Sequence, residues 1–281
     1  MRTTQAMNTP SNTLSSPQQD PLLAEHQVVS REAWTEARKE LLQKEKEHTR
    51  RYDALCAQRR ALPWVRMDKA YTFEGPNGPE SLSDLFEGRS QLIIQHFMMG
   101  PGWKEGCTGC SFLADHIDCA RLHLEPHDVT VVAVSRATYP EIAAFKKRMR
   151  WQFKWVSSHG SDFNYDFNVS FPPKQIAEGR AFYNYAWSDT EEEESPGVSV
   201  FYRDPANTVY HTYSTFSRGQ EQLVGAYNFL DLTPKGRNEN GPNLNLMDWV
   251  KHHDRYQPTG ASSSGCCCHQ NQSSTKEESV S

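Results

Sequence analysis

The stretch "QLIIQHFMMGPGWKEGCTGCSFLADHIDCARLHLEPHDVTVVAVS", residues 91–135, decides the fold class of this chain. It opens with an apolar run typical of a buried strand, residues 91–99, and closes with a second such run, residues 128–135. Between them, residues 111–124 have the periodicity of a helix, which we expect to end near Pro126. Strand, helix and strand in this order predict a parallel βαβ unit with the helix on a face of the sheet.

The segments downstream extend this α/β pattern. "YPEIAAFKKRMRW" (139–151) predicts a helix with a proline in its first turn, and "FKWVSS" (153–158) predicts a third strand. "VSVFYRDPANTVYHTYST" (198–215) alternates on either side of a turn and predicts a hairpin. "GQEQLVGAYNFLDL" (219–232) predicts a closing helix.

Composition divides the chain into segments. Residues 1–27 and 257–281 are rich in small polar residues and cannot bury enough apolar surface to fold, so we expect two disordered tails. Residues 28–60 lack Pro and Gly, and they predict a long N-terminal helix that Ser30 caps. The remainder is an α/β domain over 61–235, with a long aromatic and acidic insertion at 160–196, and a C-terminal extension over 236–256 with a short helix.

Charge and hydropathy exclude several classes of protein. The 281 residues carry a net charge of −5, without the basic footprint of a nucleic-acid-binding domain. No apolar stretch reaches the ~20 residues of a membrane span, and the N-terminus lacks the apolar region of a secretory signal. We therefore expect a cytoplasmic protein. In that compartment seven cysteines argue against a structural disulfide framework and favour catalytic or metal-binding pairs.

Cys107 and Cys110 form a Cys-x-x-Cys pair at the start of the predicted helix. Cys110 shares the apolar face of Leu113, so we expect it to be buried, whereas Cys107 lies among glycines before the first full turn and should be open to solvent. The helix dipole and the free backbone N–H groups favour a thiolate at Cys107. A Cys-x-x-Cys pair between a strand and a helix is the thioredoxin-like context, and it predicts a redox pair.

Two other interpretations of this segment stay open. The two cysteines can be ordinary buried thiols, or Cys107, Cys110, His116 and Cys119 can be a zinc ligand set, since their spacing suits one. On a continuous helix, however, Cys119 lies about 180° around and ~13 Å along from Cys110, so four ligands would meet only if the helix broke.

The remaining cysteines and histidines receive simpler interpretations. His96 lies in a buried strand run and is expected to be a core histidine with its hydrogen bonds satisfied, while His116 and His123 should face solvent. Cys56 should lie on a helix face and Cys119 opposite Cys110. For Cys266, Cys267 and Cys268 in the tail, acylation, metal capture and no role at all stay open.

Several separate segments resemble the DUF899 family. They are "YTFEGPNGPESLSDLFEGRSQLIIQHFMM" (71–99), the Cys-x-x-Cys helix, "VTVVAVSRATYPEIAAFKKRM" (129–149) and "VSVFYRDPANTVYHTYSTFSRG" (198–219). "YNFLDLTPKGRNE" (227–239) and "WVKHHDRY" (249–256) are similar to its C-terminal end. The resemblance covers residues 28–256.

This resemblance implies a thioredoxin-like fold, a central mixed sheet flanked by helices, broadly similar to the alkyl hydroperoxide reductase and thiol-specific antioxidant group. It also implies a dithiol-disulfide oxidoreductase. In such an enzyme Cys107 attacks a disulfide and Cys110 resolves the mixed disulfide. The substrate would be a disulfide-containing or dithiol protein or small molecule, and electrons would come from an external dithiol donor, with no bound cofactor or metal.

Three alternatives stay beside this function. A peroxiredoxin-like peroxidase would need Pro-x3-Thr-x2-Cys, but the register from Pro101 places Glu105 and Thr108 at those positions. A non-catalytic scaffold that keeps the fold, and a zinc-stabilised domain, are the others.

Four residues would support the pair. Trp103 and Lys104 precede it, and the charge of Lys104 would favour a thiolate at Cys107. Arg136 follows the second strand at its carboxyl end, where α/β sites gather, and would steady a thiolate or an anionic substrate. Pro196 stands where thioredoxins place a cis-proline.

Overall fold

The computed structural model describes residues 22, 25–237, 239 and 247–256. Its contacts divide the chain into two units, residues 1–62 with 232–236 and residues 63–231 with 237–281, and we describe each by itself. The predicted tails, including Cys266, Cys267 and Cys268, lie outside the described residues apart from residues 22 and 25–27.

The first unit is the predicted N-terminal helix, α2, which runs from Arg31 to Arg60. Ser30 caps it as expected, because its side chain accepts the N–H of Ala33 at 3.2 Å. No residue of α2 is buried. Its support comes from helix-forming residues and from surface ion pairs such as Lys39–Glu36 at 2.7 Å, each of which contributes little.

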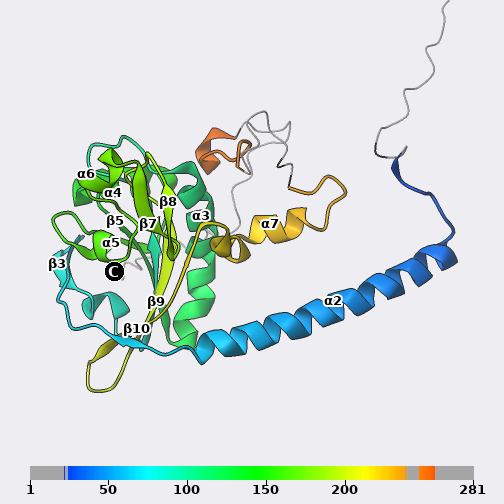
Figure 1. Ribbon diagram of the computed structural model, residues 1–281, viewed down its shortest axis with the longest axis horizontal. Coiled ribbons are helices and arrows are strands. Elements are labelled where there is room, and N and C mark those ends of the chain that lie inside the picture. Colours follow the sequence, from blue (N-terminus) through cyan, green and yellow to red (C-terminus); the bar gives the residue numbers. More distant parts are fainter. Residues whose placement is uncertain (1–21, 23–24, 238, 240–246, 257–281) are drawn as a thin grey trace, which may run out of the picture. The chain divides into compact units, whose positions relative to one another are not determined.

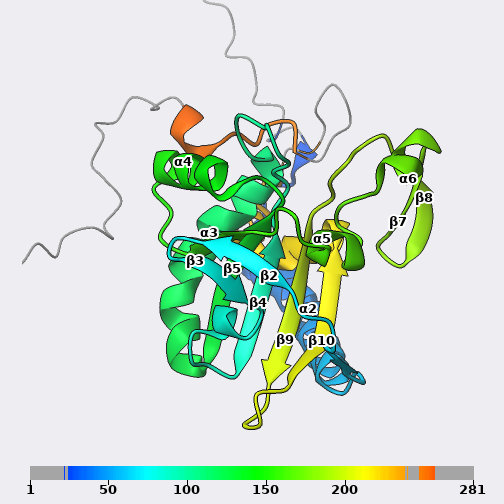
Figure 2. The ribbon, with the colours of Figure 1, turned by 90° about the vertical axis from the view of Figure 1, so that its left-hand side faces the viewer.

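The second unit is built on an eight-stranded sheet in the order β1-β10-β9-β4-β5-β6-β2-β3 (Figures 1 and 2). Its strands are β1 (Val65–Arg66), β2 (Thr72–Gly75), β3 (Gly78–Ser81), β4 (Gln91–His96), β5 (Val129–Ser135), β6 (Lys154–Ser157), β9 (Gly197–Arg203) and β10 (Val209–Phe216). A separate hairpin pairs β7 (Arg180–Tyr183) with β8 (Ala186–Asp189). The α-helices are α3 (Thr108–Leu124), α4 (Tyr139–Met149), α5 (Phe163–Asp166), α6 (Pro173–Ala177) and α7 (Gly225–Leu230). The short 3₁₀ helices are η1 (Asp84–Phe86), η2 (Glu125–His127), η3 (Ser217–Leu223) and η4 (His253–Arg255).

The connections of the central strands are those of a thioredoxin-like fold. β4 and β5 are parallel and joined through α3, and β6 continues the parallel set after α4. β9 then lies antiparallel to β4 on its other side and forms the predicted hairpin with β10, before η3 and α7 close the unit. The α/β class and the central mixed sheet predicted from the sequence are therefore confirmed.

Side chains of the central strands alternate between two cores. Ile94 and Val132 face one core together with Phe163 of α5. Ala133 faces the other core, which also contains Cys110 of α3. Figure 1 shows α3 and α7 on one side of the sheet and α5 on the other. Because both faces are covered, β4 and β5 can be apolar along almost their whole length.

Some predicted elements differ from the structure. α3 begins at Thr108, three residues earlier than expected, and its buried positions are confined to Cys110–Ala114. The predicted closing helix is split into η3 and α7, since Val224 between them has extended backbone angles (φ −97°, ψ 93°). The insertion at 160–196 contains α5, α6 and the β7–β8 hairpin. In the C-terminal extension, the described helical residues form only the 3₁₀ turn His253–Arg255.

Candidate active site

The loop between β4 and α3 is hydrogen-bonded to the sheet. It ends at Cys107, the N-cap of α3, and Cys110 follows in the first turn of the helix. The N–H of Phe97 donates to the carbonyl of Val134 at 2.9 Å, and the N–H of Ala137 donates to the carbonyl of Met99 at 2.8 Å. The N–H of Cys107 donates to the carbonyl of Met98 at 3.0 Å. The residues directly after β4 therefore continue its pairing with the β5 side up to Met99, and the bond from Cys107 ties the end of the loop back to this segment.

Cys107 is the N-cap residue of α3 and is half-buried. The pKa of its thiol is lowered to about 6, first because the thiol of Cys110 donates a hydrogen bond to its sulfur and then because the N–H groups of Cys110 and Gly109 do so. Burial and the negative charge of Glu192 act in the opposite direction. These are the local donors that a helix N-terminus supplies to an anion.

Cys110 is buried, with 3% of its surface exposed. The hydrogen bond with Cys107 and then burial raise the pKa of its thiol well above the ordinary value. The N–H of Met98 donates to its sulfur at 3.4 Å, and the amide of Gln95 donates to its carbonyl at 2.9 Å. Both cysteines are free thiols. The pair thus combines one easily ionised thiol with one sheltered thiol.

A pocket of about 530 Å³ opens beside Cys107. We call it the thiol pocket, and its apolar wall consists of Phe112, Leu113, Val224, Tyr227 and Val250. All five side chains are buried and pack in one cluster. The wall comes from α3, from the segment η3–α7 and from the C-terminal extension, so three distant parts of the sequence meet at the thiol.

The C-terminal extension is part of the site, which sequence reasoning missed. His252 is buried and its Nε2 lies 3.0 Å from the carbonyl oxygen of Gly106, the residue before Cys107. A Cβ on Gly109 would lie only 2.3 Å from Met247 Cε, so the side chain of Met247 lies directly against the first turn of α3. The signal in the sequence was the family-like segment "WVKHHDRY", whose aromatic and histidine residues are unusual for a solvated tail.

Ion pairs fasten this extension to the cysteine loop. Arg148 of α4 bonds Glu105 at 2.8 Å and Asp254 at 2.8 Å, and Arg255 bonds Glu105 at 2.6 Å. The Arg148 guanidinium, followed by that of Arg255, holds the pKa of Glu105 below its usual range against a smaller effect of burial. The network joins α4, the loop and the extension around the thiol pair.

Arg136 is paired with two residues of the insertion at 160–196. Its Nε donates to Glu194 at 2.5 Å and its Nη1 to the hydroxyl of Tyr165 at 2.6 Å. Glu194 also accepts a hydrogen bond from Ser170 at 2.7 Å. Burial raises the pKa of Glu194, and the charge of Arg136 and the bond from Ser170 act in the opposite direction. Arg136 therefore anchors the acidic end of the insertion to the sheet.

The other predicted supporting residues differ in their placement. Trp103 packs in the same cluster as Cys107 and Cys110. Lys104 is exposed, and within the described residues no contact joins it to the thiols. Pro196 lines the thiol pocket, but no described residue has a cis peptide bond, so the predicted cis-proline is wrong. The trans form is the lower-energy form of an X–Pro bond, and here it leads directly into β9.

The proposed zinc ligands lie on one continuous helix, α3, which keeps Cys119 apart from Cys110. Cys119 is exposed on α3, whereas Cys110 is buried. Both ring nitrogens of His116 are engaged, since Nδ1 lies 2.7 Å from the carbonyl of Phe112 and Nε2 accepts the N–H of Ala226 at 3.0 Å. His116 therefore joins α3 to α7 and does not face solvent as expected, whereas His123 does. No cluster that could hold a metal ion occurs in the described part of the chain.

His96 is a core histidine, but only one of its nitrogens is satisfied. Nε2 lies 2.7 Å from Ser199 Oγ, which bonds Ser214 Oγ at 2.7 Å, and this hydroxyl in turn bonds His211 Nε2 at 2.7 Å. Nδ1 is buried without a partner among the described residues. Burial, followed by the charge of His211, lowers the pKa of His96 to about 3. Burial also lowers the pKa of His211.

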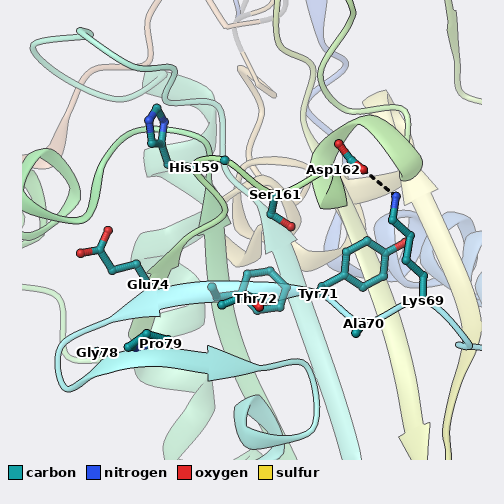
Figure 3. A pocket seen from close by; sticks show the side chains of 12 residues that line it. Lys69, Ala70, Tyr71, Thr72, Glu74, Gly78, Pro79, His159, Ser161 and Asp162 are labelled. Atoms are coloured by element: carbon teal, nitrogen blue, oxygen red, sulfur yellow. Dashed lines mark hydrogen bonds and ion pairs between the residues drawn. The ribbon is translucent and has the colours of Figure 1, made fainter.

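A second hollow, about 520 Å³, lies along β2 and residues 159–162 (Figure 3). Its one lysine, Lys69, bonds Asp162 at 2.9 Å and Asp166 at 2.6 Å, and these bonds raise its pKa. The hydroxyl of Tyr71 donates to Asp166 at 2.8 Å. Lys69 and the two carboxylates thus satisfy one another, and we place the candidate active site at the thiol pocket instead.

The family of the chain follows from a sequence comparison. A model of the family described as "Bacterial protein of unknown function (DUF899)" matches residues 23–256. The chain belongs to the DUF899 family. This match includes both cysteines and the C-terminal extension that lines the thiol pocket. No curated protein sequence matches this DUF899 protein.

Solved structures similar to this DUF899 protein are distant from it. They include the peroxidoxin BcpB from Mycobacterium tuberculosis, with 13% identity, a TM-score of 0.39 and coverage of 58% of this chain and 93% of that chain. A mutant of PrxQ from Xylella fastidiosa has 13% identity, a TM-score of 0.36 and coverage of 57% and 88%. A putative thiol:disulfide interchange protein DsbE from Chlorobium tepidum has 15% identity, a TM-score of 0.35 and coverage of 59% and 97%.

Among the described residues of this DUF899 protein, no helix combines the length and the apolar character that crossing a membrane requires.

Proposed function

We propose that this protein is a thiol–disulfide oxidoreductase in which Cys107 attacks and Cys110 resolves. The observation that carries the proposal is the asymmetry of the pair. Cys107 receives hydrogen bonds from the Cys110 thiol and from two N–H groups at the start of α3, whereas Cys110 is buried and its pKa is raised. A thiolate is the nucleophile in disulfide exchange, so Cys107 is the residue prepared to react.

The reaction runs in two exchanges. The Cys107 thiolate attacks a substrate disulfide, forms a mixed disulfide and releases one thiolate. Cys110 then loses its proton and attacks the Cys107 sulfur, which forms the intramolecular disulfide and releases the second thiol. The N–H of Met98, 3.4 Å from Cys110 Sγ, supports the charge that Cys110 acquires in this step. Cys110 supplies the proton of the second product thiol, and the first thiolate takes up from water the proton that Cys107 lost on ionising.

An external dithiol, either a protein or a small molecule, would restore the reduced pair. This cycle needs no bound cofactor, because the two sulfurs carry both electrons. We keep the cytoplasm as the proposed compartment, since a cysteine-rich chain with free thiols suits a reducing environment.

Disulfide mapping by mass spectrometry tests the function. Mild oxidation should produce a Cys107–Cys110 bond that a dithiol reverses. The Cys110→Ser variant should accumulate mixed disulfides at Cys107, and the Cys107→Ser variant should accumulate none. Cys119→Ser is the matched control, because Cys119 is exposed on the same helix outside the thiol pocket. If oxidation modified Cys119 while Cys107 and Cys110 stayed free, the proposal would be wrong.

A further inference from the structure

We infer that the substrate of the thiol pocket is a small, uncharged disulfide with an apolar arm, an inference that rests on the proposed function. Three properties of the pocket carry it: its apolar wall, the internal pairing of its charges and its size. Each property limits a different feature of the molecule that can place a disulfide beside Cys107.

The wall selects an apolar group. Phe112, Leu113, Val224, Tyr227 and Val250 present buried hydrocarbon and ring surface next to the cysteine pair. The rings of Phe112 and Tyr227 meet edge to face, with centroids 5.3 Å apart. An arm of similar chemistry on the substrate sulfur would gain from leaving water, whereas a polar arm would lose hydrogen bonds to water without replacing them.

The charges around the pocket are already neutralised. Arg218 bonds both oxygens of Glu221 at 2.6 and 3.1 Å. Glu221 also bonds Arg237 at 2.7 Å, and Arg237 bonds Asp231 at 2.6 Å. Every charged side chain that lines the pocket within the described residues thus has an opposite charge beside it.

The wall of the thiol pocket offers an anionic substrate little compensation for its charge, because Arg218 is already paired with Glu221. Glu192 lies close enough to oppose ionisation of Cys107. A substrate with carboxylates, such as glutathione disulfide, would find no unpaired cation among the wall residues that the structure describes.

The dimensions favour a small molecule over a protein loop. The volume of about 530 Å³ lies within the ~300–1,000 Å³ usual for small-molecule sites. The wall is formed from three directions by α3, by η3–α7 and by the C-terminal extension, and ion pairs fasten the extension to the cysteine loop. Such a pocket accepts one arm of a molecule and leaves little room for a broad protein surface.

The reaction is balanced with a dithiol as reductant. The reduced pair and R–S–S–R give the Cys107–Cys110 disulfide and two R–SH, and dithiothreitol then returns the pair to the reduced form while it closes to its cyclic disulfide. Two electrons and two protons pass from dithiothreitol to the substrate in each cycle.

The test compares three disulfides with dithiothreitol as the electron donor. Dibenzyl disulfide is uncharged and has apolar arms, bis(2-hydroxyethyl) disulfide is uncharged and polar, and glutathione disulfide is anionic. Each kcat/KM is divided by the rate constant for dithiothreitol alone, which corrects for intrinsic reactivity. We expect the benzyl compound to exceed the hydroxyethyl compound by about tenfold or more, which is the usual scale for apolar pocket contacts. Glutathione disulfide should be the poorest of the three.

Wall variants locate the preference. Val224→Thr and Val250→Thr keep the side-chain size and add a hydroxyl to the wall, so each should lower the benzyl-to-hydroxyethyl ratio several-fold. Val65→Thr is the control, because Val65 is 61% exposed on β1 and outside the pocket, and it should leave the ratio unchanged. Thermal unfolding of each variant confirms that the protein stays folded.

The outcomes separate the two proposals. Turnover of glutathione disulfide equal to that of the benzyl compound, or faster reduction of a disulfide-bonded protein, would overturn the substrate inference and leave the oxidoreductase function standing. No turnover of any disulfide, with Cys107 and Cys110 still free, would overturn the function and the inference together.

Discussion

Two pairs of ionisable side chains in the second unit, Cys107–Cys110 and His96–His211, have their pKa values shifted for opposite reasons. Cys107 and Cys110 meet at a pocket, where hydrogen bonds lower the pKa of one thiol to about 6. His96 and His211 are linked through two serine hydroxyls inside the sheet, where burial lowers both pKa values. In the thiol pair, donors stabilise the charged form of one member. In the histidine pair, burial outweighs the hydrogen bonds that the rings make, such as that of His211 Nε2 with the carbonyl of Tyr213.

A shifted pKa therefore has a different meaning at the two sites, because the surroundings of Cys107 and His96 differ. Around Cys107 the shift accompanies partial exposure, a neighbouring pocket and converging N–H donors, which together suit reaction with a ligand. Around His96 the neighbours are the rings of Phe163 and Phe167, at 5.6 and 5.5 Å. That shift is a matter of stability, since protonation would place a charge among aromatic rings.

The largest expected effect is the loss of disulfide exchange when Cys107 is replaced, and replacement of His96 should change stability instead. Cys107→Ser should reduce disulfide exchange by at least about a thousandfold, because it removes the nucleophile, as in other enzymes that lose a nucleophile. His96→Ala should instead lower the free energy of unfolding by about 2–4 kcal/mol, the cost of a buried large-to-small change. Rate assays and urea unfolding of both variants measure the two effects, and a stable but inactive His96→Ala protein would break the comparison.

The histidine pair predicts a pH-dependent stability. The unfolded pKa of His96 is near 6.5 and its folded pKa is about 3, so the unfolded state binds more protons between these values. Unfolding free energy should therefore fall as the pH drops below about 6.5, by up to ~1.4 kcal/mol per pH unit for His96, and the lowered pKa of His211 should act in the same direction. Urea unfolding at pH 7.5, 6.5 and 5.5 measures the slope. The His96→Gln variant should show a smaller change of unfolding free energy with pH. If this slope stayed the same as in the unmodified protein, other titratable groups would be responsible for it.

The thiol pair predicts a smaller shift in reactivity. Iodoacetamide labelling of Cys107 should be half-maximal near pH 6. Cys110→Ala removes the S–H donor, so the pKa of Cys107 should rise by about one to two units, the equivalent of a hydrogen bond to a charged group. Cys110→Ser keeps a donor and should shift the pKa less. Equal curves for the two variants would show that the N–H groups alone stabilise the thiolate.

The smallest expected effect concerns the C-terminal extension. Arg148→Met removes ion pairs to Glu105 and Asp254 that are partly exposed, so the loss of stability should be about 1 kcal/mol or less. Hydrogen exchange of residues 247–256 should nevertheless increase, because these pairs fasten the extension to the cysteine loop. Arg51→Met on α2 breaks one exposed pair and is the control. Unchanged exchange would mean that the buried contacts of His252 and Val250 hold the segment alone.

The sequence by itself determined the α/β order, the long N-terminal helix and the place of the cysteines at the start of α3. These features depend on local periodicity, on capping at Ser30 and on apolar runs such as 91–96, which are encoded in neighbouring residues. The burial of Cys110 followed in the same way from its spacing to Leu113.

Only the tertiary structure decided what surrounds the thiols. The pocket wall from Val224 and Val250 and the pairing of Arg136 with Glu194 both depend on segments that are distant in sequence. The bond between His252 and Gly106 spans 146 positions. The spacing of apolar residues shows which face of a helix or strand will be buried. Which other segments cover that face depends on how the whole chain packs.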